Sequence, residues 1–298
     1  MSYLWVLFTL LGAAGQTARN AMQRDLTPRL GAAGATLVRF LFGFPFALLF
    51  LAAVMILSHA HLPALNRDFA LWSLLGALTQ IGGTALMLMT MEQRSFVVTI
   101  AYLKTEPVLV ALMGLLLLGD PLTGPMMLAI LIALGGVALI SVKPESLAGG
   151  GKPALLGLSS AALFAASAIG YRGAILTLHQ TGIVLGATFS LAAGLTFQTL
   201  LLLAWLLLFN RRVLVALARL WRPSLMAGFA GAAASQFWFL AFALATAASV
   251  RTLALVEILF AQGVTRFVFR QKTRWREGAG IALLLAGAVL IVWANPKT

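Results

Sequence analysis

The sequence predicts an all-α membrane protein with ten transmembrane helices, arranged as two inverted five-helix repeats. One observation is composition: 61% of the 298 residues are hydrophobic and only 10% are charged, whereas soluble proteins carry about a quarter charged residues. A second is that the apolar residues form long continuous runs, unlike the alternating pattern of a membrane β-barrel. The third is that short motifs of the first half recur, in order, in the second half.

Ten apolar runs are long enough to cross a bilayer, whose core of about 30 Å takes roughly 20 helical residues. The first run has no basic segment before it, so we interpret it as a membrane helix and not as a signal peptide. Turns with helix breakers, such as GDPLTG at 119–124, separate the runs. We expect membrane spans at residues 3–23, 34–57, 69–91, 96–118, 124–142, 153–173, 183–208, 224–245, 249–269 and 278–295.

The net charge of +13 reflects membrane topology and does not indicate a nucleic-acid partner, because most basic residues lie in short segments between the apolar runs. The chain has no cysteine, which excludes disulfides and thiolate metal sites. Its three histidines form no metal triad, and it has no P-loop, G-x-S-x-G or H-E-x-x-H motif. We therefore expect no enzyme activity, no cofactor and no metal, in a chain surrounded by the lipid bilayer.

The second half of the chain repeats the first. LGAAGQTARNAM (11–22) aligns with FAASAIGYRGAI (164–175) and places Arg19 on Arg172. TEPVLVALMG (105–114) aligns with VEILFAQGVT (256–265) and places Glu106 on Glu257.

We expect a first repeat at 1–146, a linker at 147–153 and a second repeat at 154–298. Each repeat has five spans, an odd number, so the two repeats must enter the membrane in opposite senses. Inverted repeats are typical of secondary transporters, which bind substrate between the repeats near the bilayer midplane.

The segment EPVLVALMGLLLLGDPLT (106–123), followed by the glycine-rich ALGGVALISV (133–142), resembles the EamA-type repeat of the drug/metabolite transporter superfamily. That repeat has Glu-Pro in its fourth helix and a Leu-Gly-Glu turn after it, and VRFLFGFPFALL (38–49) is similar to its second helix. The resemblance implies a ten-helix transporter in a bacterial cytoplasmic (inner) membrane. It implies substrates such as amino acids, drugs or nucleotide sugars.

This chain departs from the family pattern in three places. Asp120 replaces the glutamate of the turn. In the second repeat, Glu257-Ile258 stands in place of Glu-Pro, and FRQKTR (269–274) stands in place of the Leu-Gly-Glu turn.

The predicted fourth span carries polar residues where lipid would surround them. Thr99, Tyr102 and Glu106 fall on one helical face, and Pro107 removes a backbone hydrogen bond and bends the helix beside the carboxylate. An ionisable group at the bilayer centre costs about 2.5–3.5 kcal/mol, so it usually faces a cavity or a partner. Two interpretations stay open: Glu106 lines a ligand cavity with a moving wall, or it forms a structural ion pair, for example with Arg39.

Polar residues of other spans are expected to line the same cavity. Buried glutamines often bridge helices, but two of them at matching repeat positions favour a cavity. A second proline is expected to bend its span as Pro107 bends the fourth. The residues concerned are Gln16, Arg39, Gln80, Gln236 and Glu257 for the cavity and Pro45 for the bend.

The predicted spans hold more bases than acids. Glu106 and Glu257 are accompanied by six bases within the spans or at their margins: Arg19, Arg39, Lys104, Arg172, Arg251 and Arg266. All but Arg39 and Lys104 lie near span ends, where we expect some of them to extend to water.

Two of these bases are not expected beside the acid of their own helix. Lys104 falls on the helical face opposite to Glu106, and Arg251 falls on a different face from Glu257. Arg39 is the better anchor for an anion, because a guanidinium binds a carboxylate or phosphate with two parallel hydrogen bonds.

These features predict a secondary transporter for a small amphiphilic metabolite with a carboxylate or phosphate group, such as an amino acid or organic acid. The metabolite would cross by alternating access through a cavity between the repeats. In the absence of a nucleotide-binding module, uphill transport would use a coupling proton or a counter-substrate. Two alternatives stay open: a flippase for a lipid-linked or polyprenyl-phosphate head group, and an exporter of neutral or cationic drugs. No sequence feature indicates the oligomeric state.

The distribution of basic residues predicts an orientation. Loops at 24–31, 92–95, 143–152, 209–223 and 270–277 hold thirteen Lys/Arg, whereas the opposite loops and the C-terminus hold only Arg67 and Lys297. The positive-inside rule then places both termini outside the cytoplasm, while the family resemblance implies termini inside. In intact cells we expect Leu122→Cys, and not Val215→Cys, to react with an impermeant thiol reagent. The reverse labelling would place the termini inside.

Overall fold

The computed structural model describes residues 3–93, 99, 102–141, 151–178, 181–260 and 275–294. All regular structure in these ranges is helical, which confirms the prediction of an all-α membrane protein. A π-helical turn (Gly114–Leu118) extends α5, and a 3-10 turn (Ala254–Val256) extends α12. The helices are α1 (Leu4–Leu41), α2 (Phe44–Ser58), α3 (Arg67–Gln93), α5 (Glu106–Met113), α6 (Gly124–Ser141), α8 (Gly151–Leu176), α9 (Ile183–Phe209), α10 (Arg211–Arg219), α11 (Trp221–Leu244), α12 (Ala247–Leu253) and α14 (Trp275–Ala294).

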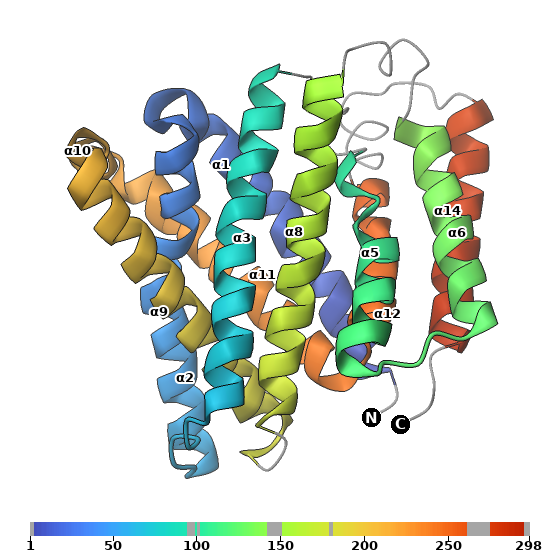
Figure 1. Cartoon of the computed structure of the whole chain (residues 1–298), viewed down its shortest axis with the longest axis horizontal. Helices are drawn as coiled ribbons and strands as arrows, with labels where there is room; N and C mark the ends of the chain where they lie inside the picture. Colours follow the sequence, from blue (N-terminus) through green and yellow to red (C-terminus); the bar gives the residue numbers. More distant parts are fainter. Residues whose placement is uncertain are drawn as a thin grey trace.

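α1 contains a sharp bend, after which the chain runs back alongside it (Figure 1). Gly31 has φ 66° and ψ 174° at this point, a backbone conformation that glycine adopts readily because it has no Cβ. The chain then continues through a short turn at Phe42 and Gly43 into α2. Pro45 lies in the first turn of α2, where its missing N–H leaves no hydrogen bond unmade. We expected Pro45 to bend its span. The irregular backbone instead lies before Pro45, at the turn of Phe42 and Gly43.

Five helical segments are long and apolar enough to cross a membrane: Gly34–Ser58, Arg67–Gln93, Gly151–Leu176, Ile183–Phe209 and Trp221–Leu244. They coincide with five of the predicted spans. Three shorter apolar helices, Glu106–Leu118, Gly124–Ile140 and Gly278–Ala294, correspond to three more.

Of the other two predicted spans, 3–23 lies within α1, and 249–269 lies outside the described residues after position 260. Residues 96–98 and 100–101 of the span at 96–118 also lie outside them. The count of ten spans stays a prediction. Residues 151–153 of the predicted linker are already helical, as the start of α8.

The segment 209–223, treated as a loop in the sequence, contains the helix α10. Its apolar side packs beside the reversal of α1, where Leu217 is buried in a cluster with Leu30 and Leu37. Arg211 and Arg212 lie on its exposed side. The four arginines of the segment concealed this amphipathic pattern, because a basic stretch between two apolar runs is typical of a loop.

Helices from the two halves of the chain pack against each other in pairs. The most extensive contacts join α1 to α11, α3 to α8 and α6 to α14, and α6 and α14 stand together at one side of the molecule (Figure 1). In each of the first two pairs, the first helix of one predicted repeat packs against the third helix of the other. Two repeats related by a two-fold axis would produce this exchange. α1 begins and α14 ends at the same end of the molecule (Figure 1).

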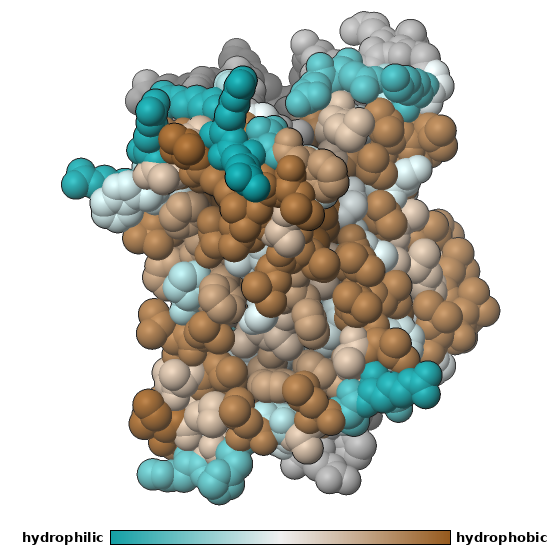
Figure 2. Space-filling model, turned by 60° about the vertical axis from the view of Figure 1, so that its left-hand side comes forward, coloured by the Kyte–Doolittle hydropathy of each residue, from teal (hydrophilic) through white to brown (hydrophobic). Residues whose placement is uncertain are grey.

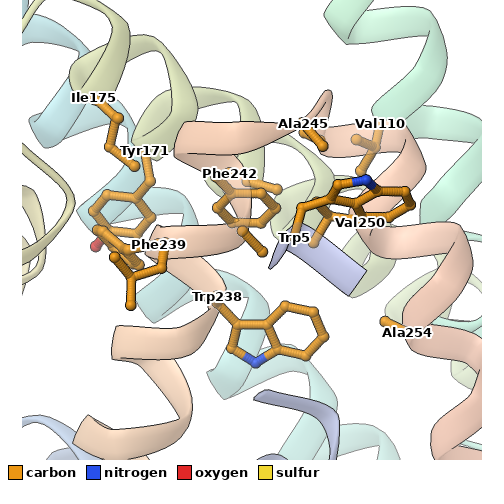
Figure 3. Close-up of a cluster of buried hydrophobic side chains, with 14 of the residues drawn as sticks. Trp5, Val110, Tyr171, Ile175, Trp238, Phe239, Phe242, Ala245, Val250 and Ala254 are labelled. Carbon is orange, nitrogen blue, oxygen red and sulfur yellow. The ribbon is translucent and has the colours of Figure 1, made fainter. Parts of the chain in front are cut away.

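The two halves share one core. Figure 3 shows Trp5 of α1 and Val110 of α5 close to the aromatic side chains of α11. Tyr171 of α8 lies against Phe239 of α11, with ring centroids 4.7 Å apart. The face seen in Figure 2 is also apolar: brown side chains cover its middle, and hydrophilic residues gather towards its two ends. An apolar surface of this extent is the one expected of a protein surrounded by lipid.

Close crossing of α6 and α14 predicts different effects of alanine at two adjacent glycines. A Cβ on Gly136 would lie 2.6 Å from the carbonyl oxygen of Gly280, whereas a Cβ on Gly135 would meet nothing within 4 Å. We expect Gly136→Ala to destabilise the protein by about 1–3 kcal/mol, because the two backbones must move apart. Gly135→Ala should be neutral or slightly stabilising, since alanine favours helix. Thermal unfolding in detergent measures both variants, and equal melting temperatures would contradict the packing described here.

Candidate functional site

A cavity between the two halves of the chain gathers the charged residues of the membrane interior. Its empty volume is about 560 Å³, part of which is open to solvent. It is lined by Gln16, Arg19, Asn20, Arg39, Gln80, Met87, Leu103, Lys104, Glu106, Phe164, Arg251 and Glu257.

Both acids of the cavity follow directly after irregular backbone. Helix is interrupted at Lys104 and Thr105, and α5 starts at Glu106, with Pro107 in its first turn. The Thr105 hydroxyl donates a hydrogen bond to the Tyr102 carbonyl (2.8 Å), which holds the turn. In the other half, Glu257 follows the 3-10 turn that extends α12. Discontinuous helices of this kind form the substrate sites of many secondary transporters.

The interruption corrects the expectation that Lys104 and Glu106 lie on opposite faces of one regular helix. Both residues line the cavity. The helical-wheel angle assumed a continuous helix, and the turn at 104–105 changes the direction of Lys104.

Two ion pairs cross the cavity from one half of the chain to the other. Lys104 bonds to Glu257, and Glu106 Oε1 lies 3.1 Å from Arg251 Nε. All four side chains are largely buried. Gln16 Nε2 also donates to Glu257 Oε2, at 3.2 Å. Each acid is thus compensated by a base from the opposite half.

These pairs answer two questions that the sequence left open. Glu106 does form an ion pair, but its partner is Arg251 and not Arg39. Arg251 does not extend to water: its guanidinium lies over the Trp238 ring, 4.8 Å from the centroid. Arg251 and Glu257 both line the cavity, and each pairs with a residue of the first half.

Arg19 and Arg39 form no ion pair with any carboxylate in the described part of the chain, although they are only 4% and 8% exposed. Both side chains pack over Gly231, where an added Cβ would lie 3.2 Å from Arg19 Cδ and 3.9 Å from Arg39 Cγ. Arg39 Nη1 donates to Thr84 Oγ1 at 3.4 Å.

Arg19 is only partly satisfied. Its Nη2 and Nε donate to Asn20 Oδ1 at 2.8 and 3.3 Å, whereas its Nη1 is buried and has no hydrogen-bond partner. Arg19 is not one of the bases that extend to water, because the end of its span packs against α11 and the side chain is buried there.

The structure brings together five of the predicted cavity residues: Gln16, Arg39, Gln80, Glu106 and Glu257. Gln80 accepts a hydrogen bond from Gln198 Nε2 (2.7 Å) at the edge of the cavity.

Three predicted cavity residues lie elsewhere. Thr99 is buried, Tyr102 packs over Gly157, and Gln236 donates to Thr188 Oγ1 at 2.7 Å. None of the three is among the residues that line the cavity. Thr99 and Tyr102 were placed beside Glu106 by regular helical spacing, which the turn at 104–105 interrupts.

A third buried ion pair lies away from the cavity. Arg172 of α8 binds Asp120 with two hydrogen bonds, Nε to Oδ2 and Nη2 to Oδ1, both at 3.0 Å. Its Nη1 donates to the carbonyls of Phe242 (2.6 Å) and Ala245 (2.5 Å), at the end of α11. Arg172 therefore ties the turn after α5 to α8 and α11.

Sequence reasoning missed this pair, although the family pattern pointed to it, since Asp120 replaces the usual acid of that turn. Arg172 does not extend to water either, because Asp120 and the carbonyls of Phe242 and Ala245 bind its guanidinium inside the protein. Arg266 lies outside the described residues.

The sequence of the first half matches a known family of membrane transporters. Residues 3–142 match the EamA-like transporter family. The first half of the chain is therefore similar to membrane transporters of this family. The match agrees with the resemblance to EamA-type transporters described from the sequence.

The likeness to solved structures extends over the whole chain. A crystal structure superimposes on this chain with a TM-score of 0.67, covering 99% of this chain and 98% of the other, at 14% sequence identity. Such low identity shows a shared fold only. No curated protein has a matching sequence. Among the described residues, no group of three or more His, Cys, Asp or Glu side chains could hold a metal ion.

The Arg172 ion pair predicts a large loss of stability when its acid is neutralised. We expect Asp120→Asn to lower the free energy of unfolding by about 3–5 kcal/mol, because Arg172 then keeps a buried charge without an anion. Asp68→Asn, at an exposed position in the first turn of α3, is the matched control and should have little effect. Thermal unfolding in detergent compares the two, and an Asp120→Asn protein as stable as the control would exclude a structural role for the pair.

Proposed function

We propose that the protein is a secondary transporter for a small amphiphilic organic anion, with a carboxylate or phosphate as its charged group. The anion crosses by alternating access through the cavity between two inverted repeats, 1–146 and 154–298, in a bacterial inner membrane. The observation that carries this proposal is the charge of the cavity: four bases and two acids line it.

Charge complementarity supports an anion over a cation. Each acid is already paired with a base, so the cavity offers a cation no free carboxylate among the described residues. Arg39 and Arg19, in contrast, have no acidic partner there. In a low-dielectric site an uncompensated guanidinium is costly, and a carboxylate or phosphate that binds it in a fork restores the balance.

Apolar side chains support an amphiphilic substrate. Met87, Leu103 and Phe164 line the cavity together with the charged groups. Ligand sites commonly combine such apolar walls with a few polar groups that fix the orientation of the ligand.

The two crossed ion pairs support a mechanism in which the halves move relative to each other. They join the discontinuous helices at the centre of the molecule, so a rearrangement of the halves must stretch or exchange them. Substrate or a proton that competes for one partner would release the pair. We therefore assign the coupling of transport to these pairs, with a proton or a counter-substrate as the driving species.

Transport by purified protein in liposomes tests the proposal. Saturable uptake of a radiolabelled water-soluble carboxylate or phosphate ester is the expected result. Uptake of quaternary amines alone would contradict it and support an exporter of cationic drugs. Translocation of a polyprenyl-phosphate lipid, with no uptake of soluble anions, would support a flippase.

Neutralising one acid of the crossed pairs should separate transport from folding. We expect Glu106→Gln to fold and to transport at least roughly tenfold more slowly, because Arg251 loses the carboxylate that holds it in one conformation. Glu92→Gln, at an exposed position near the end of α3, is the control and should transport at the full rate. A Glu106→Gln variant with an unchanged rate and unchanged pH dependence would remove Glu106 from the mechanism.

A further inference from the structure

Building on the proposed transport of an anion, we infer that the substrate is a dianion that binds between Arg19 and Arg39. This narrows the proposed class from organic anions in general to dicarboxylates and phosphate monoesters. It disfavours zwitterionic amino acids.

The charge balance of the cavity is the first step. Lys104 pairs with Glu257, and Arg251 pairs with Glu106. These four residues neutralise one another, so among the described residues that line the cavity the two positive charges left in excess belong to Arg19 and Arg39. A dianion would balance both charges and a monocarboxylate would balance one, whereas a zwitterion brings an ammonium with its carboxylate and leaves the net charge of the cavity unchanged.

Geometry places the two arginines where one ligand can reach both. They line the same cavity and pack over the same glycine, Gly231. Arg19 keeps one buried guanidinium nitrogen, Nη1, without a hydrogen-bond partner. A buried donor without a partner costs roughly 1–3 kcal/mol or more when charged, so a ligand oxygen at this position is stabilised strongly.

Arg172 shows how an arginine at this position of a repeat holds an anion. Arg172 and Arg19 align in the two halves of the sequence. Arg172 binds the two oxygens of Asp120 through Nε and Nη2 and places its Nη1 on backbone carbonyls. The turn that contains Asp120 aligns with FRQKTR (269–274), which has no acid. In Arg19 the corresponding Nε and Nη2 are bonded to Asn20 Oδ1, and Nη1 is the nitrogen left without a partner. We assign the acidic group of the substrate to this Nη1.

Five probes of one carbon skeleton test the inference. Succinate, butyrate, 4-aminobutyrate and butylammonium share a four-carbon chain and differ in net charge, and butyl phosphate supplies a phosphate monoester, which has a charge of about −1.5 to −2 at pH 7. Binding is measured as the rise in melting temperature of the purified full-length protein, since a ligand of the folded state stabilises it. We expect succinate or butyl phosphate to bind roughly tenfold or more tightly than butyrate, and 4-aminobutyrate and butylammonium not to bind. The dianion with the higher affinity, succinate or butyl phosphate, shows whether the substrate is a dicarboxylate or a phosphate monoester.

Variants then assign the charge to residues. Arg19→Gln should weaken binding of the dianion by roughly tenfold or more. It should also reduce the ratio of the affinities for dianion and butyrate, because only one uncompensated charge remains. Arg39→Gln should do the same. Arg212→Gln, an exposed arginine on α10, is the control and should leave every affinity unchanged. Should Arg19→Gln fail to fold, Arg19→Lys keeps the charge without the fork and should still weaken the dianion more than butyrate.

The outcomes separate this inference from the proposed function. Three results would overturn the inference. In the first, butyrate binds as tightly as the dianions. In the others, neither Arg19→Gln nor Arg39→Gln changes the affinity for the dianion, or neither dianion binds. If butyrate binds as tightly and depends on Arg39, the proposed anion transport survives. Binding of butylammonium alone would overturn both.

Discussion

The ion pairs that cross between the halves, Lys104 with Glu257 and Arg251 with Glu106, are the interactions on which the site depends. A charge inside a membrane protein is tolerated when it has a partner or faces a polar cavity. Here every partner comes from the opposite half, so neither half could bury its own charges alone. The pairs also meet at the two places where a helix is interrupted, at 104–105 and at 254–256.

Three buried arginines show how neighbouring groups determine what the same side chain does. Arg172 has a carboxylate and two carbonyls as partners, and it ties three parts of the chain together. Arg251 has a carboxylate and an aromatic ring. Arg19 has only the amide of Asn20 for two of its nitrogens. A guanidinium with all its donors satisfied is structural, whereas one with a buried free donor is suited to bind an anion.

Close packing of small residues makes these encounters possible. Gly170 of α8 approaches the backbone of Gly76 in α3, and Gly136 of α6 approaches that of Gly280 in α14. In a bilayer, helices gain little from the hydrophobic effect when they associate, and close approach through small residues supplies van der Waals contact instead. The glycines therefore hold the two halves at the distance at which charged side chains can reach across.

Local properties of the chain determined much of this protein. Mean hydropathy and continuous apolar runs determined that it is an all-α membrane protein, and the motif around Glu106 and Pro107 indicated the transporter family that its first half resembles. The sequence also showed that the spans hold more bases than acids. Five cavity residues were predicted from their polar side chains: Gln16, Arg39, Gln80, Glu106 and Glu257.

Only the tertiary structure decided which charges meet. Helical spacing placed Thr99 and Tyr102 beside Glu106 and Lys104 away from it, because spacing assumes an unbroken helix. The partners of Glu106 and Arg172 lie far away in the sequence, and nothing in a single chain without an alignment says which of several bases an acid will face. Whether a side chain near a span end reaches water depends on what packs over it. For Arg19 that is a helix from the other half of the chain.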